Sequence, residues 1–324
     1  MFEKASWIEN IDSTGEDTYT EFLIPVPKIG REVKLYVSCD GFFAAFKDKE
    51  VLPIAFSACA DMPNYKLYDC FDLSGKLKKN DEIKLQVYHG GADTANYIAA
   101  PSGVIFELQV DGALVLCSDI NTKCRVINEY RNGYRKQITP QLGFSFFYNA
   151  DKFCETKKYV NAVLGKRPVA FYPRNINNQF LGAFIKGRII RDGDSTLLDL
   201  GEETTGFLYL DITCEKKGNV IISYGEHILD GGVRRKIGDC DFSVTYGAQE
   251  GENKYINCFR RLGCRYLEIF ADEGVVKSIN AIGIYPTGYQ TKRKKVKYRD
   301  KIVDKINSIC VKTLELCMHE HYED

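Results

Sequence analysis

Residues 82–88 have the sequence Glu-Ile-Lys-Leu-Gln-Val-Tyr, in which polar and apolar side chains alternate. This period of two is typical of a half-buried β-strand. At residues 111–112, an Asp-Gly pair provides the positive-φ positions of a tight hairpin turn. Because no helical pattern separates the strand-like runs, we expect an all-β fold of antiparallel β-sandwiches. Further runs of this kind occupy residues 34–38, 104–110, 207–212, 219–224 and 266–270.

The length of 324 residues is enough for about two domains. Between about 148 and 182 the alternation stops, and Pro, Asn and charged residues interrupt the sequence. We therefore predict a first jelly-roll-like β-sandwich over residues 1–150, a linker over 151–182, and a second β-sandwich over 183–290.

The sequence changes character in its last part, residues 291–324. Residues 292–297, Lys-Arg-Lys-Lys-Val-Lys, are typical of a solvated linker. From about 300 to 322 apolar residues recur at helical spacing, and Asp300 can cap the first turn. We predict a single amphipathic helix here, the first helix of a missing domain. Its apolar stripe is expected to pack on the second sandwich or on another copy of the chain, and consists of Ile302, Ile306, Cys310, Thr313 and Cys317.

Composition narrows the class of protein. Lys and Arg total 44, as do Asp and Glu, so the basic excess that is usual for nucleic-acid binding is absent. No apolar run is long enough for a transmembrane helix, and charges interrupt any signal peptide at the N-terminus. We therefore expect a cytoplasmic protein whose 12 cysteines, none in Cys-x-x-Cys spacing, are free.

The most specific stretch is residues 313–324, Thr-Leu-Glu-Leu-Cys-Met-His-Glu-His-Tyr-Glu-Asp. It closely resembles the beginning of the catalytic domain of bacterial α-L-rhamnosidases, glycoside hydrolase family 78. In that family the run continues as Asp-Cys-Pro-x-Arg-Glu on an (α/α)6 barrel, whereas this chain ends at the Asp. Residues 198–207, 224–232 and 259–268 are similar to family motifs, and residues 65–83 to the galactose-binding-like sandwich that precedes them.

The resemblance implies the accessory β-domains of an inverting glycosidase that cleaves terminal α-L-rhamnose from a glycoside or polysaccharide. Inverting hydrolysis needs a general acid and a general base, about 6.5–9.5 Å apart. The resemblance assigns Asp324 to a catalytic-site carboxylate position and puts the general acid and base beyond the chain end. We therefore expect no hydrolysis by this chain alone, and a missing catalytic domain as its partner.

Other chemistry-bearing residues favour structural roles. Cys317, His319, His321 and Asp324 are metal-ligand types, but residues two apart on a helix face different sides, so we predict no metal site and no cofactor. The adjacent pair at 226–227, Glu-His, would face opposite sides of a strand, and we expect a structural role for the glutamate.

Sugar binding is the alternative function. Sandwich domains bind sugars by stacking them on aromatic side chains, with polar groups at the rim. The candidates are Trp7, Tyr65, Tyr68 and Tyr97. The chain would then be a stand-alone carbohydrate-binding protein with no hydrolytic role. In either case the expected ligand is a rhamnose-containing glycoside or oligosaccharide, and a homodimer through the C-terminal helix is the alternative to a catalytic-domain partner.

Overall fold

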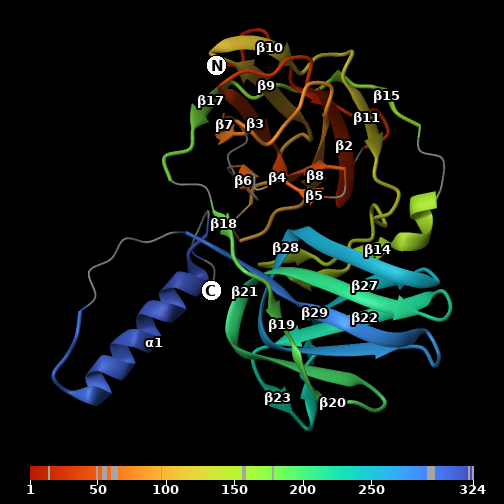
Figure 1. The fold of residues 1–324 in the computed structure, drawn as a ribbon, viewed down its shortest axis with the longest axis vertical. Coiled ribbons are helices and arrows are strands. Elements are labelled where there is room, and N and C mark those ends of the chain that lie inside the picture. Colours follow the sequence, from red (N-terminus) through yellow and green to blue (C-terminus); the bar gives the residue numbers. More distant parts are fainter. Residues whose placement is uncertain are drawn as a thin grey trace.

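The computed structural model describes residues 1–13, 15–48, 50–52, 57–59, 65–95, 97–154, 158–176, 179–289, 296–319 and 322. Two β units are stacked on each other, and a helix projects to one side (Figure 1). In the described part of the chain, the only helices are the 3-10 helix η1 (Ala150–Cys154) and the α-helix α1 (Lys301–Cys317). The predicted all-β class with one C-terminal α-helix is confirmed.

The first unit is a sandwich of two seven-stranded sheets. The first sheet contains β1 (Ile8–Glu9), β3 (Val33–Cys39), β7 (Tyr65–Asp72), β9 (Val104–Val110), β10 (Ala113–Cys117), β16 (Val163–Leu164) and β17 (Ala170–Pro173). Its strand order is β16-β1-β9-β3-β7-β17, with β10 beside β9.

The second sheet of this unit has the order β15-β11-β2-β8-β4-β5, with β6 beside β4. Its strands are β2 (Thr18–Pro25), β4 (Gly41–Lys47), β5 (Glu50–Val51), β6 (Ser57–Cys59), β8 (Glu82–His89), β11 (Lys123–Val126) and β15 (Val160–Asn161).

The alternation in β8 explains how the sandwich forms. Ile83, Leu85 and Val87 are at most 4% exposed and pack in the core between the two sheets. The intervening residues Lys84 and Gln86 face away from that core and are partly exposed. Burying one apolar face of each strand supplies most of the stabilisation of such a sandwich.

The predicted hairpin joins β9 to β10. Asp111 and Gly112 have φ of 50° and 79°, the left-handed values that a two-residue hairpin turn requires. Val110 and Ala113 then face each other as the first pair of the antiparallel ladder. The local sequence was sufficient to place this turn.

The second unit is built on a nine-stranded sheet with the order β14-β27-β22-β28-β21-β29-β18, to which β19 and β20 add. These strands are β14 (Phe147–Asn149), β18 (Phe180–Leu181), β19 (Ile185–Lys186), β20 (Arg188–Arg191), β21 (Thr196–Cys214), β22 (Gly218–Gly225), β27 (Ser243–Ala248), β28 (Gly251–Ala271) and β29 (Val276–Gly288). The small two-stranded pairs are β12 (Gln137–Thr139) with β13 (Gly143–Phe144), β23 (Ile228–Leu229) with β24 (Gly232–Val233), and β25 (Lys236–Ile237) with β26 (Cys240–Asp241).

The two long strands β21 and β28 take part in both layers of the second unit. The start of β21 pairs with the end of β28, which lies beside β22. The register shifts between Asp199 and Thr204, and the rest of β21 then pairs with the start of β28 and with β29. Irregularities of this kind bend a strand and increase its twist. The second unit therefore has two layers formed by one continuous sheet.

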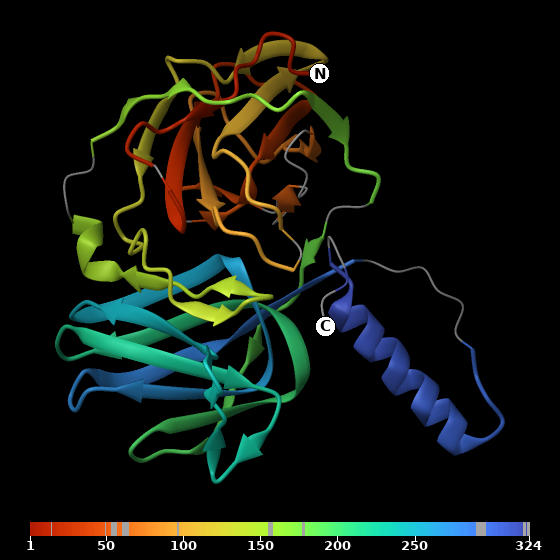
Figure 2. The same ribbon diagram turned by 180° about the vertical axis from the view of Figure 1, so that it is seen from behind.

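The segment between the two predicted sandwiches contributes strands to both units. β14 pairs in parallel with β27 of the second unit. After η1 the chain returns to the first unit, where β15 and β16 join its two sheets and β17 pairs with β7. Figure 2 shows this segment crossing the first unit before the chain descends to the second. The expected linker of residues 151–182 thus includes edge strands of the first sandwich.

The two units share a continuous hydrophobic core. Tyr19 and Tyr88 extend from the first unit, Tyr255 and Phe259 belong to β28, and Tyr130 lies between them. The ring of Tyr19 stacks on that of Tyr130 at 3.9 Å between centroids, and the Tyr130 and Tyr255 hydroxyl oxygens are 2.8 Å apart. All five side chains are at most 8% exposed, so the units are packed together rather than merely tethered.

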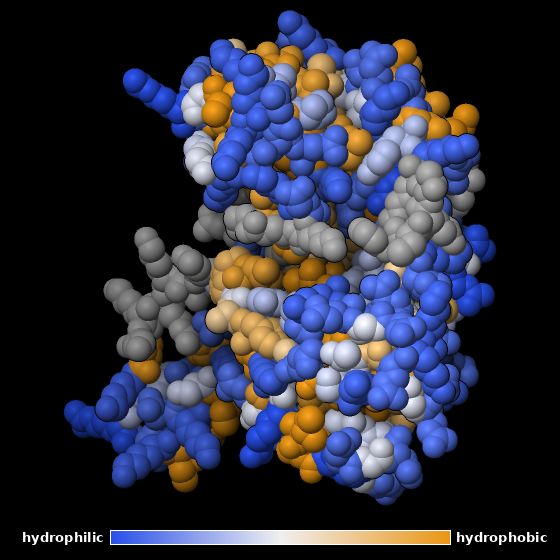
Figure 3. Space-filling model, turned by 45° about the vertical axis from the view of Figure 1, so that its right-hand side comes forward, coloured by the Kyte–Doolittle hydropathy of each residue, from blue (hydrophilic) through white to orange (hydrophobic). Residues whose placement is uncertain are grey.

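Helix α1 begins as predicted, because the Asp300 carboxylate accepts hydrogen bonds from the amides of Ile302 and Val303 at 2.7 and 3.2 Å. Its apolar stripe was expected to pack on the second sandwich or on another copy of the chain. The first of these alternatives is wrong, because the stripe is not packed on the second unit. Ile302 and Ile306 are 71% and 54% exposed, and no residue of α1 is buried. Figure 3 shows hydrophobic residues on the projecting helix. Within the described ranges, neither helix has the length and apolar character needed to cross a bilayer.

Candidate functional site

A buried cluster of charged and polar side chains lies where the two sheets of the first unit meet. Its centre is Asp40, between the end of β3 and the start of β4, with no exposed surface. Gly41 makes the sharp turn possible: its φ is +92°, and a Cβ atom there would lie 2.2 Å from the carbonyl oxygen of Tyr88. The turn therefore carries the Asp40 carboxylate into the interior.

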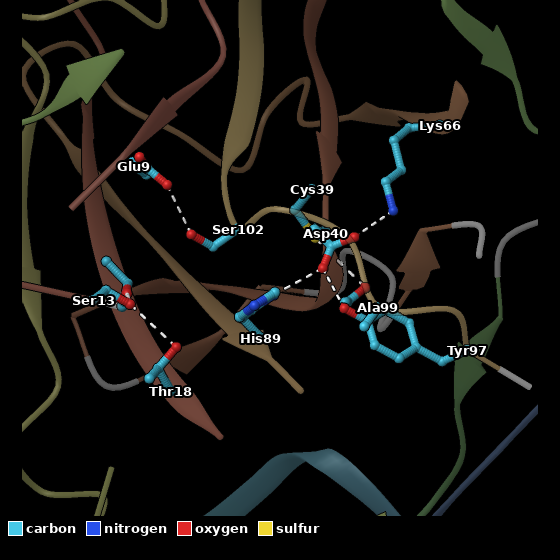
Figure 4. Close-up of polar contacts among 12 residues, drawn as sticks. Glu9, Ser13, Thr18, Cys39, Asp40, Lys66, His89, Tyr97, Ala99 and Ser102 are labelled. Atoms are coloured by element: carbon cyan, nitrogen blue, oxygen red, sulfur yellow. Dashed lines mark hydrogen bonds and ion pairs between the residues drawn. The ribbon is translucent and has the colours of Figure 1, made fainter. Parts of the chain in front are cut away.

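Three donors surround this carboxylate (Figure 4). Lys66 of β7 forms an ion pair with Oδ1. Oδ2 lies 2.8 Å from Nδ1 of His89, the last residue of β8, and accepts a 2.5 Å hydrogen bond from the Tyr97 hydroxyl. Residues from both sheets and from the loop after β8 thus converge on one acceptor, which compensates for burying its charge.

Electrostatics fixes the direction of the bond from Tyr97. Burial and the negative charge of Asp40 raise the pKa of the Tyr97 hydroxyl above its ordinary value. The hydroxyl therefore keeps its proton at neutral pH and donates a hydrogen bond to the carboxylate. Lys66, which is 1% exposed, supplies the positive charge opposite Asp40.

The loop that carries Tyr97 reaches the second unit. Within the loop, the amide of Thr94 donates to the carbonyl oxygen of Tyr97 at 2.9 Å, and Asp93 accepts from the amide of Ala99 at 2.7 Å. A Cβ atom added to Gly143 of the β12–β13 hairpin would lie 3.2 Å from the Thr94 methyl group. The Asp40 cluster therefore holds a loop that packs against the neighbouring unit.

The Asp40–His89 contact is of the kind that orients an imidazole in acid–base catalysis. Catalysis would also need a nucleophile or a substrate group beside Nε2 of the ring. In the part of the chain that the structure describes, no hydroxyl or thiol is hydrogen-bonded to that nitrogen. What the contacts of the cluster do show is that Asp40 holds Tyr97 and the loop around it in place.

Of the four aromatic residues predicted to bind sugar, Trp7 and Tyr68 lie inside the first unit. Trp7 is 2% exposed, and its indole NH donates to the carbonyl oxygen of Ser102 at 3.0 Å. Tyr68 is partly buried and packs edge-on against Phe2, with 5.4 Å between ring centroids. Trp7 therefore presents no open ring face to a ligand, whereas Tyr68 keeps part of its surface exposed.

Tyr65 and Tyr97 are nearer the surface. Tyr65 is 37% exposed and packs edge-on against Tyr172 of the neighbouring strand β17. Tyr97 is the one predicted residue that belongs to the Asp40 cluster, through its hydroxyl group. Trp7 and Tyr68 share one hydrophobic cluster, whereas Tyr97 belongs to the Asp40 cluster. The role of the four side chains in sugar binding stays a prediction.

Two carboxylates interact in the second unit, near α1. Burial and the negative charge of Glu226 raise the pKa of Glu203 to about 7. The neighbouring Glu202 forms an ion pair with Lys312 of the helix. Near neutral pH, Glu203 can therefore carry a proton and donate a hydrogen bond. This interaction gives Glu226 an electrostatic effect on its neighbour that the sequence did not indicate.

The predicted catalytic-site residue Asp324 lies outside the described residues, as does His321. Of the nearby ligand-type residues, His319 is 5% exposed, with its Nε2 atom 3.4 Å from the Thr287 hydroxyl. Among the residues that the structure describes, no group of three or more His, Cys, Asp or Glu side chains is arranged to hold a metal ion.

The sequence reasoning missed Asp40, Lys66 and His89. Lys66 follows Asp40 by 26 residues and His89 follows it by 49, so no local sequence spacing links the three. The only available signal was the position of Lys66, which follows one of the predicted aromatic residues at the start of a strand.

No family model and no curated protein matches the chain. Solved structures do match it. The family 78 rhamnosidase of Bacillus sp. GL1 is similar over 99% of this chain, with a TM-score of 0.79 and 12% identity. The α-L-rhamnosidase of Dictyoglumus thermophilum is similar over 97%, with a TM-score of 0.74 and 15% identity. That of Streptomyces avermitilis, complexed with L-rhamnose, is similar over 95%, with a TM-score of 0.71 and 12% identity.

In each case this chain corresponds to only part of the other protein, covering 59%, 39% and 32% of the three structures. At 12–15% identity the likeness establishes the fold. Both β units and their mutual arrangement are those found in part of the family 78 rhamnosidases. The predicted resemblance is thus confirmed at the level of the fold.

Proposed function

We propose that this chain is the accessory β-region of an α-L-rhamnosidase-like, inverting glycoside hydrolase that acts on terminal α-L-rhamnosides. The observation that supports this function is the fold likeness over 95–99% of the chain to part of three rhamnosidases. In the proposed enzyme, the two β units bind carbohydrate or hold the catalytic domain in place, and the catalytic domain carries the acid and the base.

Helix α1 is the proposed surface for that domain. Its exposed apolar residues include Ile302, Ile306 and Ile309, which are 54–71% exposed. An exposed apolar face on a 17-residue helix favours association, because most helical stability comes from packing such a face. Without the catalytic domain, a second copy of the chain is the proposed occupant of the same face.

The experiment that tests the function is hydrolysis of an aryl α-L-rhamnoside. Purified 1–324 is expected to give no turnover, because a single carboxylate at Asp324 cannot act as both general acid and general base. Turnover should appear when an (α/α)6 catalytic domain from the same gene region is supplied. Turnover by 1–324 itself that is lost in Asp324→Ala would contradict the proposal.

The coding sequence after Asp324 separates this function from a stand-alone carbohydrate-binding protein. Continuation into Cys-Pro-x-Arg-Glu supports the hydrolase, whereas a stop codon supports either the stand-alone protein or a fragment whose partner chain carries the catalytic domain. We also propose a reducing compartment such as the cytoplasm. The support is a set of seven described cysteines with free thiols: Cys117, Cys124, Cys214, Cys240, Cys258, Cys264 and Cys310.

A further inference from the structure

A cavity of about 570 Å³ lies between the two β units, apart from the Asp40 cluster. Its lining includes residues of β2, β4, β8 and β11 and of the segment after β11, together with β14, β27 and β28 of the second unit. Figure 1 shows the two units stacked, with β28 and β14 on the side of the second unit that faces the first. The volume is within the range of about 300–1,000 Å³ that is usual for small-molecule sites.

Buried charges form one wall of this cavity. Glu21, Arg125 and Glu129 are at most 7% exposed. Arg125 donates through Nε to Glu21 at 2.8 Å and through Nη1 to Glu129 at 3.2 Å. Glu21 also accepts from Tyr159 at 2.7 Å and from Gln86 at 2.8 Å. The wall is therefore held rigidly by its own hydrogen bonds before any ligand arrives, which lowers the entropic cost of binding.

Tyrosines from the second unit form another wall of the cavity. Tyr148 stacks on Tyr255 with 4.2 Å between ring centroids, and Tyr246 lies nearly parallel to Tyr148 at 5.9 Å. Burial raises the pKa of Tyr148 to about 12, so its hydroxyl is neutral and can donate or accept a hydrogen bond. This wall offers apolar ring edges together with hydroxyl groups, the combination that suits a ligand with both CH and OH surfaces.

The charges around the cavity nearly cancel. At its rim, Asp48 and Lys84 come from the first unit, and Glu252 and Lys254 from the second. Together with the buried wall, the lining has four acidic and three basic side chains. A phosphate or a polyanion would meet no excess of positive charge here, and the near balance favours an uncharged ligand.

We propose that this inter-unit cavity binds a neutral saccharide, of about one or two sugar rings. The proposal rests on the carbohydrate-binding part of the proposed function and assigns it to a specific place. Carboxylate, guanidinium and tyrosine hydroxyl groups bind sugar hydroxyls, and the tyrosine ring edges contact the CH groups of the ring. Because both units contribute, bound saccharide also links them.

Calorimetry on the full chain tests the proposal, with L-rhamnose, D-galactose and a neutral disaccharide as probes. Tyr148→Phe and Glu129→Gln each keep the shape of the side chain and remove one polar function. Each is expected to weaken saccharide binding about tenfold, the effect of losing about 1.4 kcal/mol of binding free energy. The matched controls Tyr172→Phe and Glu32→Gln lie outside the cavity, on an exposed strand and an exposed turn, and should bind as the wild type does.

Hydrogen exchange on the wild type gives a readout that does not depend on the variants. Saccharide should protect peptides of residues 125–130 and 246–256. Binding that both variants leave unchanged, with protection elsewhere, would overturn the cavity site and leave carbohydrate binding intact. Absence of any saccharide binding would also overturn it, while the hydrolysis assay would still test the enzyme role. Choline serves as a cationic probe in the same calorimetry. Binding of choline without binding of the sugars would overturn the ligand class, because the site would then select a cation.

Discussion

The hydroxyl group of Tyr97 donates a hydrogen bond of 2.5 Å to the carboxylate of Asp40, 57 residues earlier in the chain. Asp40 has no exposed surface, and Tyr97 belongs to a loop that packs against the second unit. This single bond therefore connects the interior of the first sandwich to the junction between the units.

Replacing Tyr97 by phenylalanine should loosen that loop. The variant removes a donor to a charged acceptor, so we expect the free energy of unfolding to fall by about 1.5–3 kcal/mol. Amides of residues 90–99 should also exchange faster in the folded protein. Urea denaturation and hydrogen exchange measure the two effects. Tyr172→Phe, at an exposed tyrosine, is the control and should change neither; unchanged exchange in Tyr97→Phe would refute the connection.

Lys66→Met should destabilise the protein more strongly, because it leaves the buried carboxylate of Asp40 without its cation. We expect a loss of about 3–5 kcal/mol, measured by denaturant unfolding. Adding Asp40→Asn to this variant should recover part of the loss, since the uncompensated charge is then gone. Lys34→Met, which breaks an ion pair that is partly exposed, is the control and should have little effect. A double variant no more stable than Lys66→Met would contradict this account.

The raised pKa of Glu203 predicts a pH-dependent stability. Its pKa is about 7 in the folded protein, against 4.5 ordinarily. Between these two pH values Glu203 binds more proton in the folded state than in the unfolded state. The free energy of unfolding therefore falls as the pH rises from 4.5 to 7. Glu203→Gln should therefore gain stability relative to wild type over this range. Thermal unfolding at several pH values measures it, with Glu202→Gln as the control. A pH-independent difference would be inconsistent with the assigned titration.

The cysteines should differ in reactivity according to their burial. Cys310 is exposed on α1 and should be alkylated in the folded protein. Cys258 and Cys264 are at most 2% exposed, and burial raises the pKa of both thiols, so they should react only after unfolding. Pulsed alkylation followed by mass spectrometry distinguishes the two groups. A disulfide-linked peptide between any of these cysteines would be the contrary result.

Changes to α1 should affect association without affecting the fold of the chain. Ile302 and Ile306 are mostly exposed, so replacing both by glutamine should leave the unfolding midpoint unchanged. In the absence of a catalytic domain, we expect the wild-type chain to self-associate at micromolar concentration and the variant to be monomeric. Sedimentation velocity measures this. A monomeric wild type would remove the second copy as an occupant of the helix.

Local patterns predicted the elements whose structure depends on neighbouring residues. The alternation in β8 and the Asp-Gly turn after β9 are of this kind, as is the cap of α1 at Asp300. The strands at residues 160–173 were not predicted, because each has only two to four residues. Their conformation is imposed by the strands with which they pair, so the sequence has no periodicity of its own there.

The Asp40 cluster could not be predicted for a related reason. A lysine or an aspartate is usually exposed, and only the pairing of the two makes their burial acceptable. Lys66 and Asp40 meet because β7 and the β3–β4 turn belong to one sandwich, a property of the topology. The aromatic residues near them were detectable as residue types, but their surroundings depend on the same topology.

The path of the chain between the units also affects how the protein folds during synthesis and how its parts can be exchanged by recombination. Synthesis completes β14 of the second unit before the last strands of the first, which end at Pro173. A ribosome-bound nascent chain must therefore hold the first sandwich with open edges until that point, and only later form the second sheet. For the same reason, a single genetic crossover cannot transfer one intact unit to another protein, so the pair is inherited as one module.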